Sequence, residues 1–141
     1  MLDRRQIHTV IDTLIREARI RSVSDIHITE GMPVWYRIHG CLTQARDVLK
    51  EYDIREVLLG MMNEKQRKQF EDGQDVDFAW QTTDGCRQRV NIFCEQKKIA
   101  ATIRLLNQHI PTLEELKIPT TLYQLSEEPR GIILVTGPTG S

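Results

Sequence analysis

The sequence has almost no net charge and no long apolar run. Its 19 Lys and Arg residues face 20 Asp and Glu residues, which gives a formal net charge of -1. This balance leaves no overall positive field to attract a nucleic acid or an anionic membrane. No apolar stretch approaches the roughly 18 residues that a membrane-spanning helix needs, and residues 1–5 lead into a helical pattern instead of a signal peptide. We therefore predict a cytoplasmic protein that does not bind nucleic acid.

Cysteine is scarce and scattered. The three cysteines, Cys41, Cys86 and Cys94, are odd in number and stand among apolar strand residues, which favours reduced thiols with a packing role over disulfides. His27 and His39 add two further possible zinc ligands, but none of these residues has the short paired spacing of a structural zinc site. We therefore expect no metal site.

Three segments carry the pattern of helices. In the first of them, apolar residues recur at steps of three and four, at Ile7, Val10, Ile11, Leu14, Ile15 and Ala18. This spacing places them on one face of an amphipathic helix. Asp53 with Glu56, and Asn63 with Gln66, have the form of capping boxes. They predict a second helix and a short, charged third helix directly after each cap.

Other segments alternate apolar and polar residues, as strands with one buried face do. Such alternation covers residues 25–29, 34–39, 76–80, 90–94 and 99–105. A tight turn at His39–Cys41 leads into a further strand, and the last two rows flank the polar turn Glu95–Lys98 as a β-hairpin. Three strands, two helices and three strands predict an α+β domain, a mostly antiparallel sheet covered by helices, that ends near Leu106.

The predicted hairpin places Arg89 directly opposite Arg104. This register follows from pairing Cys94 with Ile99, and it puts both arginines on the face away from the core. Like charges directly opposite each other destabilise a strand pair by about a few tenths of a kcal/mol, unless an anion lies between them. A nucleotide phosphate is the natural anion, because a guanidinium binds phosphate oxygens through two parallel hydrogen bonds. Arg87 shares the same face and is a second-rank candidate.

The residues alone leave a second interpretation of these arginines open. Each could instead pair with an acidic neighbour, such as Asp75, Asp77 or Glu95, on a solvated sheet face. Asp25 and His27, on the polar side of the first strand, are expected to make structural hydrogen bonds at the sheet edge or at a contact with the next domain.

The last part of the chain has the pattern of an α/β domain. Pro119 suits the first turn of a short helix, and Gly131–Val135 is apolar without alternation, as a strand buried in a parallel sheet is. The residues that follow after Thr136 are Gly137, Pro138, Thr139, Gly140 and Ser141. They match the opening of the phosphate-binding loop G-x-x-x-x-G-K-[ST], whose backbone N–H groups surround phosphates and whose Ser or Thr binds magnesium. Taken alone, the same letters are equally consistent with a simple turn.

The sequence resembles the PilT-type ATPases over nearly its whole length. The motifs that carry the resemblance are Ser24–Ile28 (SDIHI), Gly31–Pro33 with Arg37 and Gly40, Arg89–Phe93 (RVNIF), Thr112–Leu116 (TLEEL) and Pro129–Ser141. The resemblance implies a PAS-like N-terminal domain over residues 1–106, an interdomain linker over 107–118 and the start of a RecA-like ATPase core over 119–141. His39 and Val34 depart from the family pattern, so the branch, pilus retraction or pilus assembly and type II secretion, stays open.

The resemblance also implies a function and its partners. It implies a cytoplasmic homohexameric ATPase that drives type IV pilus retraction, and so twitching motility, or related secretion, and that reaches the inner membrane through a platform protein. ATP and Mg²⁺ would be cofactors of the full-length protein. Arg89 and Arg104 would approach the γ-phosphate, with Arg87 and residues 137–141 as further nucleotide contacts.

Two further expectations concern these 141 residues by themselves. The lysine and the magnesium ligand would follow Ser141, so this fragment alone is expected to bind nucleotide weakly and to hydrolyse none. The alternative function is a free-standing PAS-like binding or scaffold module without catalysis.

Overall fold

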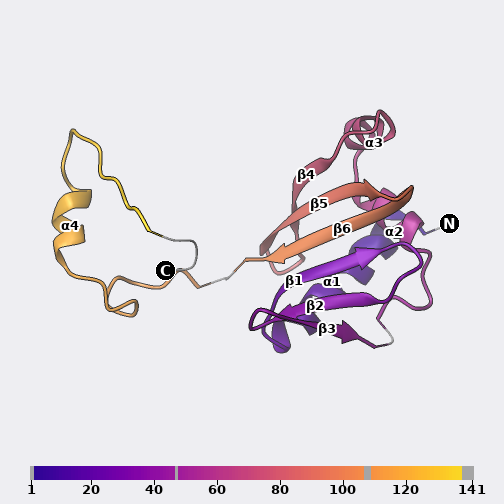
Figure 1. Ribbon diagram of the computed structural model, residues 1–141, viewed down its shortest axis with the longest axis horizontal. Coiled ribbons are helices and arrows are strands. Elements are labelled where there is room, and N and C mark those ends of the chain that lie inside the picture. Colours follow the sequence, from indigo (N-terminus) through magenta and orange to yellow (C-terminus); the bar gives the residue numbers. More distant parts are fainter. Residues whose placement is uncertain (1, 47, 107–108, 138–141) are drawn as a thin grey trace. The chain divides into compact units, whose positions relative to one another are not determined.

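The computed structural model describes residues 2–46, 48–106 and 109–137. The chain divides into two compact units, residues 1–106 and residues 107–141 (Figure 1). The first unit contains, in chain order, α1 (Arg4–Ile20), β1 (Val23–Thr29), β2 (Val34–Ile38), β3 (Cys41–Ala45), α2 (Ile54–Met61), α3 (Glu64–Glu71), β4 (Val76–Gln81), β5 (Arg87–Glu95) and β6 (Lys98–Leu105). The second unit contains α4 (Thr121–Ser126).

The strands of the first unit form one six-stranded sheet in the order β3-β2-β1-β6-β5-β4. Every neighbouring pair in it is antiparallel. Strands β1 to β3 and strands β4 to β6 each follow one another across the sheet, and the two halves meet where β1 pairs with β6. The predicted α+β class is confirmed.

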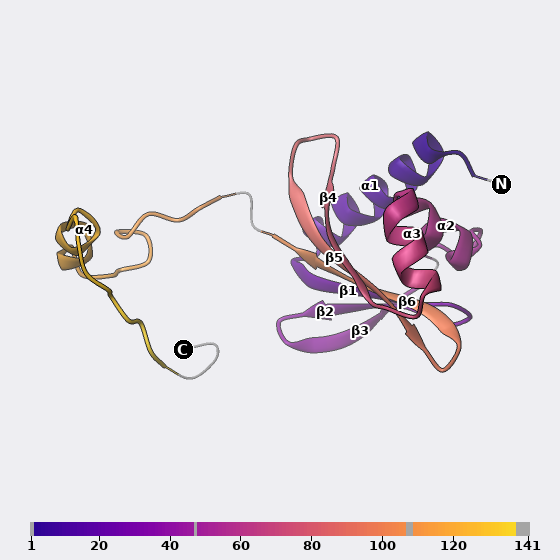
Figure 2. The same ribbon diagram turned by 90° about the horizontal axis from the view of Figure 1, so that it is seen from above.

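The helices α1 and α2 cover one face of this sheet (Figure 2). The apolar stripe of α1 is turned toward the sheet, where Ile11 and Ile15 are fully buried. Ile26, Val90 and Ile103 are fully buried from the sheet side. Burial of such a side chain contributes about 1.5–3 kcal/mol to folding. The opposite side of the sheet, which carries no helix of the first unit in the described residues, is called the open face below.

The helix caps fix how the helices of the first unit begin. The box predicted for Asn63 and Gln66 is present, with both N–H to side-chain oxygen distances at 2.9 Å. Asp53 accepts from the backbone N–H of Glu56 at 3.3 Å. The Glu56 carboxylate accepts from the backbone N–H of Leu2, which ties the start of the chain to α2.

The second unit departs from one prediction. The strand expected over Gly131–Val135 is not formed, and Ile132, Leu134 and Val135 are 85%, 80% and 91% exposed. The described part of this unit contains no strand that could pair with the segment, and an unpaired strand leaves its backbone groups without partners. The helix expected near Pro119 is α4, which begins at Thr121.

None of the three cysteines, all of which are described, forms a disulfide. Cys41 and Cys94 are exposed, so the packing role predicted for them is wrong; each stands near a strand end, beside a turn. Cys86 is half-buried. Across the described part of the chain, no helix has both the length and the apolarity to cross a bilayer.

Candidate anion site on the open sheet face

Arg89 and Arg104 lie directly opposite each other on β5 and β6, in the predicted register. Two residues with left-handed backbone, Gln96 and Lys97, form the turn between the strands. Val90 is buried in the core directly beside Arg89. Because side chains alternate between the two faces along each strand, both arginines project from the open face.

Each arginine is paired with a carboxylate on the strand that lies beyond it. Arg89 Nε donates to Asp77 Oδ1 on β4 at 2.9 Å, and Arg104 Nε donates to Asp25 Oδ1 on β1 at 2.9 Å. The acidic neighbour considered for Arg89 is therefore present. The partner of Arg104 was not predicted, because the sequence does not reveal that β1 lies beside β6.

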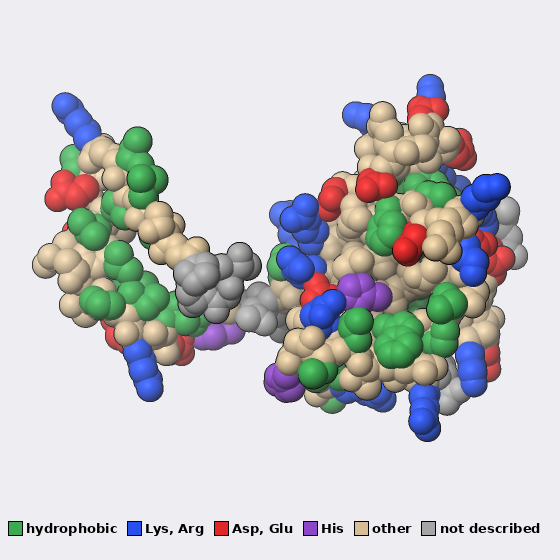
Figure 3. All heavy atoms as spheres, viewed as in Figure 1, with side chains coloured by type: hydrophobic (Ala, Val, Ile, Leu, Met, Phe, Trp, Pro, Cys, Tyr) green, Lys and Arg blue, Asp and Glu red, His purple; other side chains and the backbone are tan. Residues whose placement is uncertain are grey.

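The two carboxylates lie on opposite sides of the arginine pair, and a hollow of about 330 Å³ lies over the open face of β4, β5 and β6. It is lined by Asp77, Arg89, Asn91, Thr102 and Arg104. Asn91 and Thr102 are themselves paired across β5 and β6. Figure 3 shows basic and acidic side chains next to one another on this face of the first unit.

Asp25 is the most buried charged group on the open face, at 5% exposure. Burial by itself raises the pKa of this carboxyl, but the hydrogen bonds from Arg104 and Ser24, with the charge of Arg104, outweigh it and the pKa is lowered. Ser24 Oγ donates to Asp25 Oδ2 at 2.9 Å, and Arg37 Nε lies 3.7 Å from the same oxygen. Asp25 is thus held ionised between two arginines.

Asp77 has a similar but more exposed environment. The hydrogen bond from Arg89 lowers the pKa of the Asp77 carboxyl, and Asn91 Nδ2 also donates to it at 3.1 Å. In return, the hydrogen bond to Asp77 raises the pKa of the Arg89 guanidinium. Asp77 therefore stays ionised and Arg89 stays charged through the neutral range.

His27 adjoins the hollow on the β1 side. Its Nδ1 lies 3.4 Å from the Thr102 hydroxyl, while its Nε2 is buried without a hydrogen-bond partner in the described residues. Burial, with the nearby charge of Arg37, lowers the pKa of His27. The structural hydrogen bonds predicted for Asp25 and His27 are present, but β1 lies inside the sheet and not at its edge.

The other predicted site residues are not part of this hollow. Arg87 is exposed at the far end of β5, opposite Gln81 on β4. Gly137 is exposed and belongs to no helix or strand. Pro138, Thr139, Gly140 and Ser141 lie outside the described residues.

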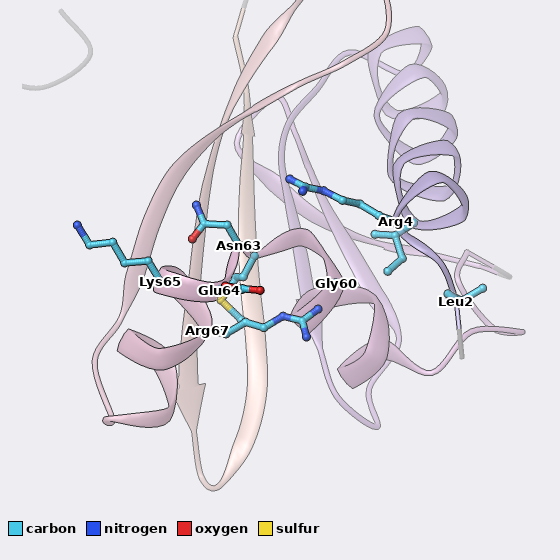
Figure 4. Close-up of a pocket in the computed structure, with 9 residues that line it drawn as sticks. Leu2, Arg4, Gly60, Asn63, Glu64, Lys65 and Arg67 are labelled. Carbon is cyan, nitrogen blue, oxygen red and sulfur yellow. The ribbon is translucent and has the colours of Figure 1, made fainter.

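A larger hollow, of about 620 Å³, lies between the start of α1, the end of α2 and the start of α3 (Figure 4). Two of its basic side chains diverge, since Arg67 reaches toward Gly60 while Lys65 points outward. Arg67 Nε donates to the carbonyl oxygen of Leu59 at 2.8 Å and so caps the end of α2. The Arg67 contact is therefore structural, and none of the predicted site residues lines this hollow.

Comparison with known proteins identifies relatives over most of the chain. The chain is 33% identical over 132 residues to the type IV pilus retraction ATPase PilT of Pseudomonas aeruginosa, covering 93% of this chain and 38% of that protein. It is 34% identical to a twitching motility protein of Neisseria gonorrhoeae, over 92% of this chain and 35% of the relative. The crystal structure of the pilus retraction motor PilT with bound ADP matches with a TM-score of 0.78 and 35% identity, over 93% of this chain and 39% of that one.

More distant structures share the fold alone. The ATPase DotB of Legionella pneumophila matches with a TM-score of 0.64 at 22% identity, over 94% of this chain and 38% of that chain. The chain spans between about a third and two fifths of the length of these relatives. The family model described as "Type II/IV secretion system protein" matches residues 1–141. The chain belongs to the type II/IV secretion system protein family.

Proposed function

We propose that this chain is the N-terminal part of a motor ATPase in which Arg89 and Arg104 bind the terminal phosphate of ATP. The observation that carries the proposal is the hollow on the open face that is lined by two arginines paired directly across β5 and β6. One anion placed there would be bound from both sides and would remove the repulsion between the two arginines. Relatives named as a pilus retraction ATPase and an ADP-bound motor support a nucleotide as that anion.

Binding of the terminal phosphate by Arg89 and Arg104 would couple ATP hydrolysis to motion of this domain. The γ-phosphate is present before hydrolysis and is released afterwards, so the two arginines would have their ligand only in the ATP state. A ligand that binds one domain arrangement better than another shifts the equilibrium between the two. Hydrolysis would therefore change the position of this domain relative to the ATPase core.

The remaining parts of the proposal concern the full-length protein. Residues 107–118 would form a linker, and residues 119–141 would begin a RecA-like core whose phosphate-binding loop opens at Gly137. A lysine and a hydroxyl residue after Ser141 would bind the phosphates and Mg²⁺. Arg87 would be a secondary contact. Homohexamers at the cytoplasmic side of the inner membrane, bound to a platform protein, would retract type IV pili. The names of two relatives, a type IV pilus retraction ATPase and a twitching motility protein, support the pilus as the object of this motor.

The test uses the full-length protein with single arginine substitutions. We expect Arg89→Ala and Arg104→Ala each to lower kcat/KM for ATP by about tenfold or more, which is about 1.4 kcal/mol of transition-state stabilisation. Arg16→Ala, which removes an exposed arginine from α1, serves as the matched control. If both site variants hydrolyse ATP as fast as this control, the proposal is wrong, and a binding or scaffold module is the better description.

A further inference from the structure

Both arginines of the hollow are held in the same way, through Nε. Among the described residues, Nε is the one guanidinium nitrogen of Arg89 and of Arg104 that donates a hydrogen bond. The two terminal nitrogens of each group remain for another acceptor. Since a guanidinium binds an oxyanion best through two neighbouring N–H groups, a carboxylate at Nε orients the side chain without occupying all of its donors.

The two carboxylates are themselves oriented by uncharged donors. Asp25 uses Oδ1 for Arg104 and accepts from the Ser24 hydroxyl with Oδ2. Asp77 uses Oδ1 for Arg89 and accepts from the Asn91 amide with Oδ2. The same arrangement, a neutral donor, a carboxylate and then Nε of an arginine, is thus found on both sides of the arginine pair.

The charges on this part of the open face leave it positive. Arg37, Arg104 and Arg89 contribute three positive charges, against the two negative charges of Asp25 and Asp77. The carboxylates lie on β1 and β4, outside the β5–β6 pair, so each attracts its arginine away from the other. The site therefore keeps a net attraction for an anion while the repulsion between the arginines is reduced.

From this geometry we infer that Asp25 and Asp77 are positioning residues for a phosphate group that enters between Arg89 and Arg104. The inference rests on the proposed function and extends it to the residues that prepare the site. A free arginine loses side-chain entropy when it is fixed in one conformation. Because a carboxylate already holds Nε in the folded protein, part of this entropy is lost before the ligand binds.

The two positions differ in how much they contribute. The Asp25 side chain is 8% exposed and is shared by Arg37 and Arg104, whereas the Asp77 side chain is 49% exposed. Ion pairs that are open to solvent are weakened by water and salt. We therefore expect Asp25 to hold Arg104 in place more strongly than Asp77 holds Arg89.

The experiment measures how well the full-length protein distinguishes ATP from ADP. We expect Asp25→Asn to reduce the preference for ATP over ADP by about tenfold, or about 1.4 kcal/mol, with ADP affinity unchanged, because ADP lacks the phosphate that the arginines would bind. Asp77→Asn should reduce the same ratio by a smaller factor. Asp75→Asn is the matched control, since Asp75 is an exposed carboxylate just before β4.

A second measurement follows the arginines directly in the 141-residue chain. The Nε–H signals of Arg89 and Arg104, observed by ¹⁵N NMR, should exchange slowly with water, and the signal of Arg104 should be lost in Asp25→Asn while that of Arg89 is kept. If Asp25→Asn fails to fold, Asp77→Asn and Ser24→Ala carry the test, because both side chains they alter are more exposed than Asp25.

The outcomes separate the two proposals. If Arg89→Ala and Arg104→Ala both leave the ATP to ADP ratio unchanged, the proposed function fails. If Arg104→Ala lowers that ratio but Asp25→Asn and Asp77→Asn do not, only the positioning inference is overturned. In support of it, Asp25→Asn should add nothing in an Arg104→Ala background, because residues that act through one another are not additive.

Discussion

At the residue scale, Gly60 marks the place where α2 comes closest to α1. A Cβ on Gly60 would lie 1.9 Å from Cδ1 of Ile7, which is 3% exposed, so the Ile7 side chain would have to shift. We expect Gly60→Ala to lower the free energy of unfolding by about 1–3 kcal/mol through overpacking. This loss opposes the roughly 1 kcal/mol by which alanine is favoured over glycine inside a helix. Urea unfolding followed by circular dichroism measures the difference.

A second substitution, at Ile7, tests whether the contact with its Cδ1 atom causes this destabilisation. Ile7→Val removes Cδ1 and by itself should cost about 0.5–1.5 kcal/mol. Combined with Gly60→Ala, it should cost clearly less than the sum of the two single changes, because the atom that clashes is gone. Strictly additive losses would show that another contact is responsible.

A second residue-scale prediction concerns pH and His27. Its pKa is lowered from 6.5 in the folded protein, so below about pH 6.5 the unfolded chain binds more protons there than the folded one does. Stability from this group is therefore full above pH 6.5 and is lost as the pH falls through the lowered pKa. We expect the urea midpoint to drop between pH 7.5 and pH 5.5.

The His27→Gln variant isolates that effect, because glutamine does not titrate. Its midpoint should change less over the same pH range. His39→Asn is the matched control, because it removes a histidine from an exposed turn and asparagine accepts the positive φ of 47° found there. An equal flattening of the pH dependence in both variants would exclude His27 as the source.

At the element scale, the turn that sets the register of the β5–β6 hairpin is formed by residue types that disfavour its backbone conformation. Gln96 and Lys97 have φ values of 49° and 66°, the backbone of a type I′ turn, in which Asn-Gly is preferred. We expect Gln96→Asn combined with Lys97→Gly to raise the free energy of unfolding by about 1 kcal/mol. Thermal and urea midpoints measure the gain.

A substitution to glycine just outside the turn should instead lower the free energy of unfolding. Lys98→Gly places a glycine in β6, where it has no backbone strain to relieve and should cost about 0.5–1 kcal/mol. A stabilising effect of Lys98→Gly, or no gain from the Asn-Gly turn, would contradict the explanation from backbone strain. The turn matters for the site because it sets Arg89 opposite Arg104.

The sequence predicted the structural features that depend on local pattern. The stripe of α1 and the pairing of Arg89 with Arg104 depend on neighbours along the helix or across one turn. The sheet order depends on contacts between distant residues, and Asp25 is 79 positions from Arg104. For this reason Asp77 was one of three carboxylate partners that the sequence left open, with Asp75 and Glu95, whereas Asp25 was not among them.

The strand predicted at Gly131–Val135 shows a different limit. An apolar run without alternation describes a segment that suits burial on both faces of a parallel sheet. The described residues of the second unit supply no such sheet, so the segment is exposed and without strand structure. The apolar pattern therefore indicates the environment that the segment needs, a buried position in a parallel sheet. It does not indicate whether that sheet is present.

At the scale of the whole molecule, the stability of the described chain lies in its first unit. All residues of the buried core lie between Ile7 and Ile103. We expect a chain cut after Leu106 to unfold cooperatively, with a free energy within about 0.5 kcal/mol of that of residues 1–141. The exposed run Ile132–Val135 should promote self-association of the longer chain, and the cut should abolish it. Urea unfolding and analytical ultracentrifugation measure the two effects.

The position of the cut can be tested to a single residue. Gln88 is fully buried, and its Oε1 accepts from the backbone N–H of Leu106 at 3.0 Å, while its Nε2 has no partner among the described residues. Cutting after Leu105 removes that donor and leaves the whole Gln88 amide unpaired, which should cost about 1–3 kcal/mol relative to the cut after Leu106. Since the Leu106 side chain is 47% exposed, little apolar burial is lost with it. Equal stability of the two truncated chains would mean that this hydrogen bond does not define the end of the domain.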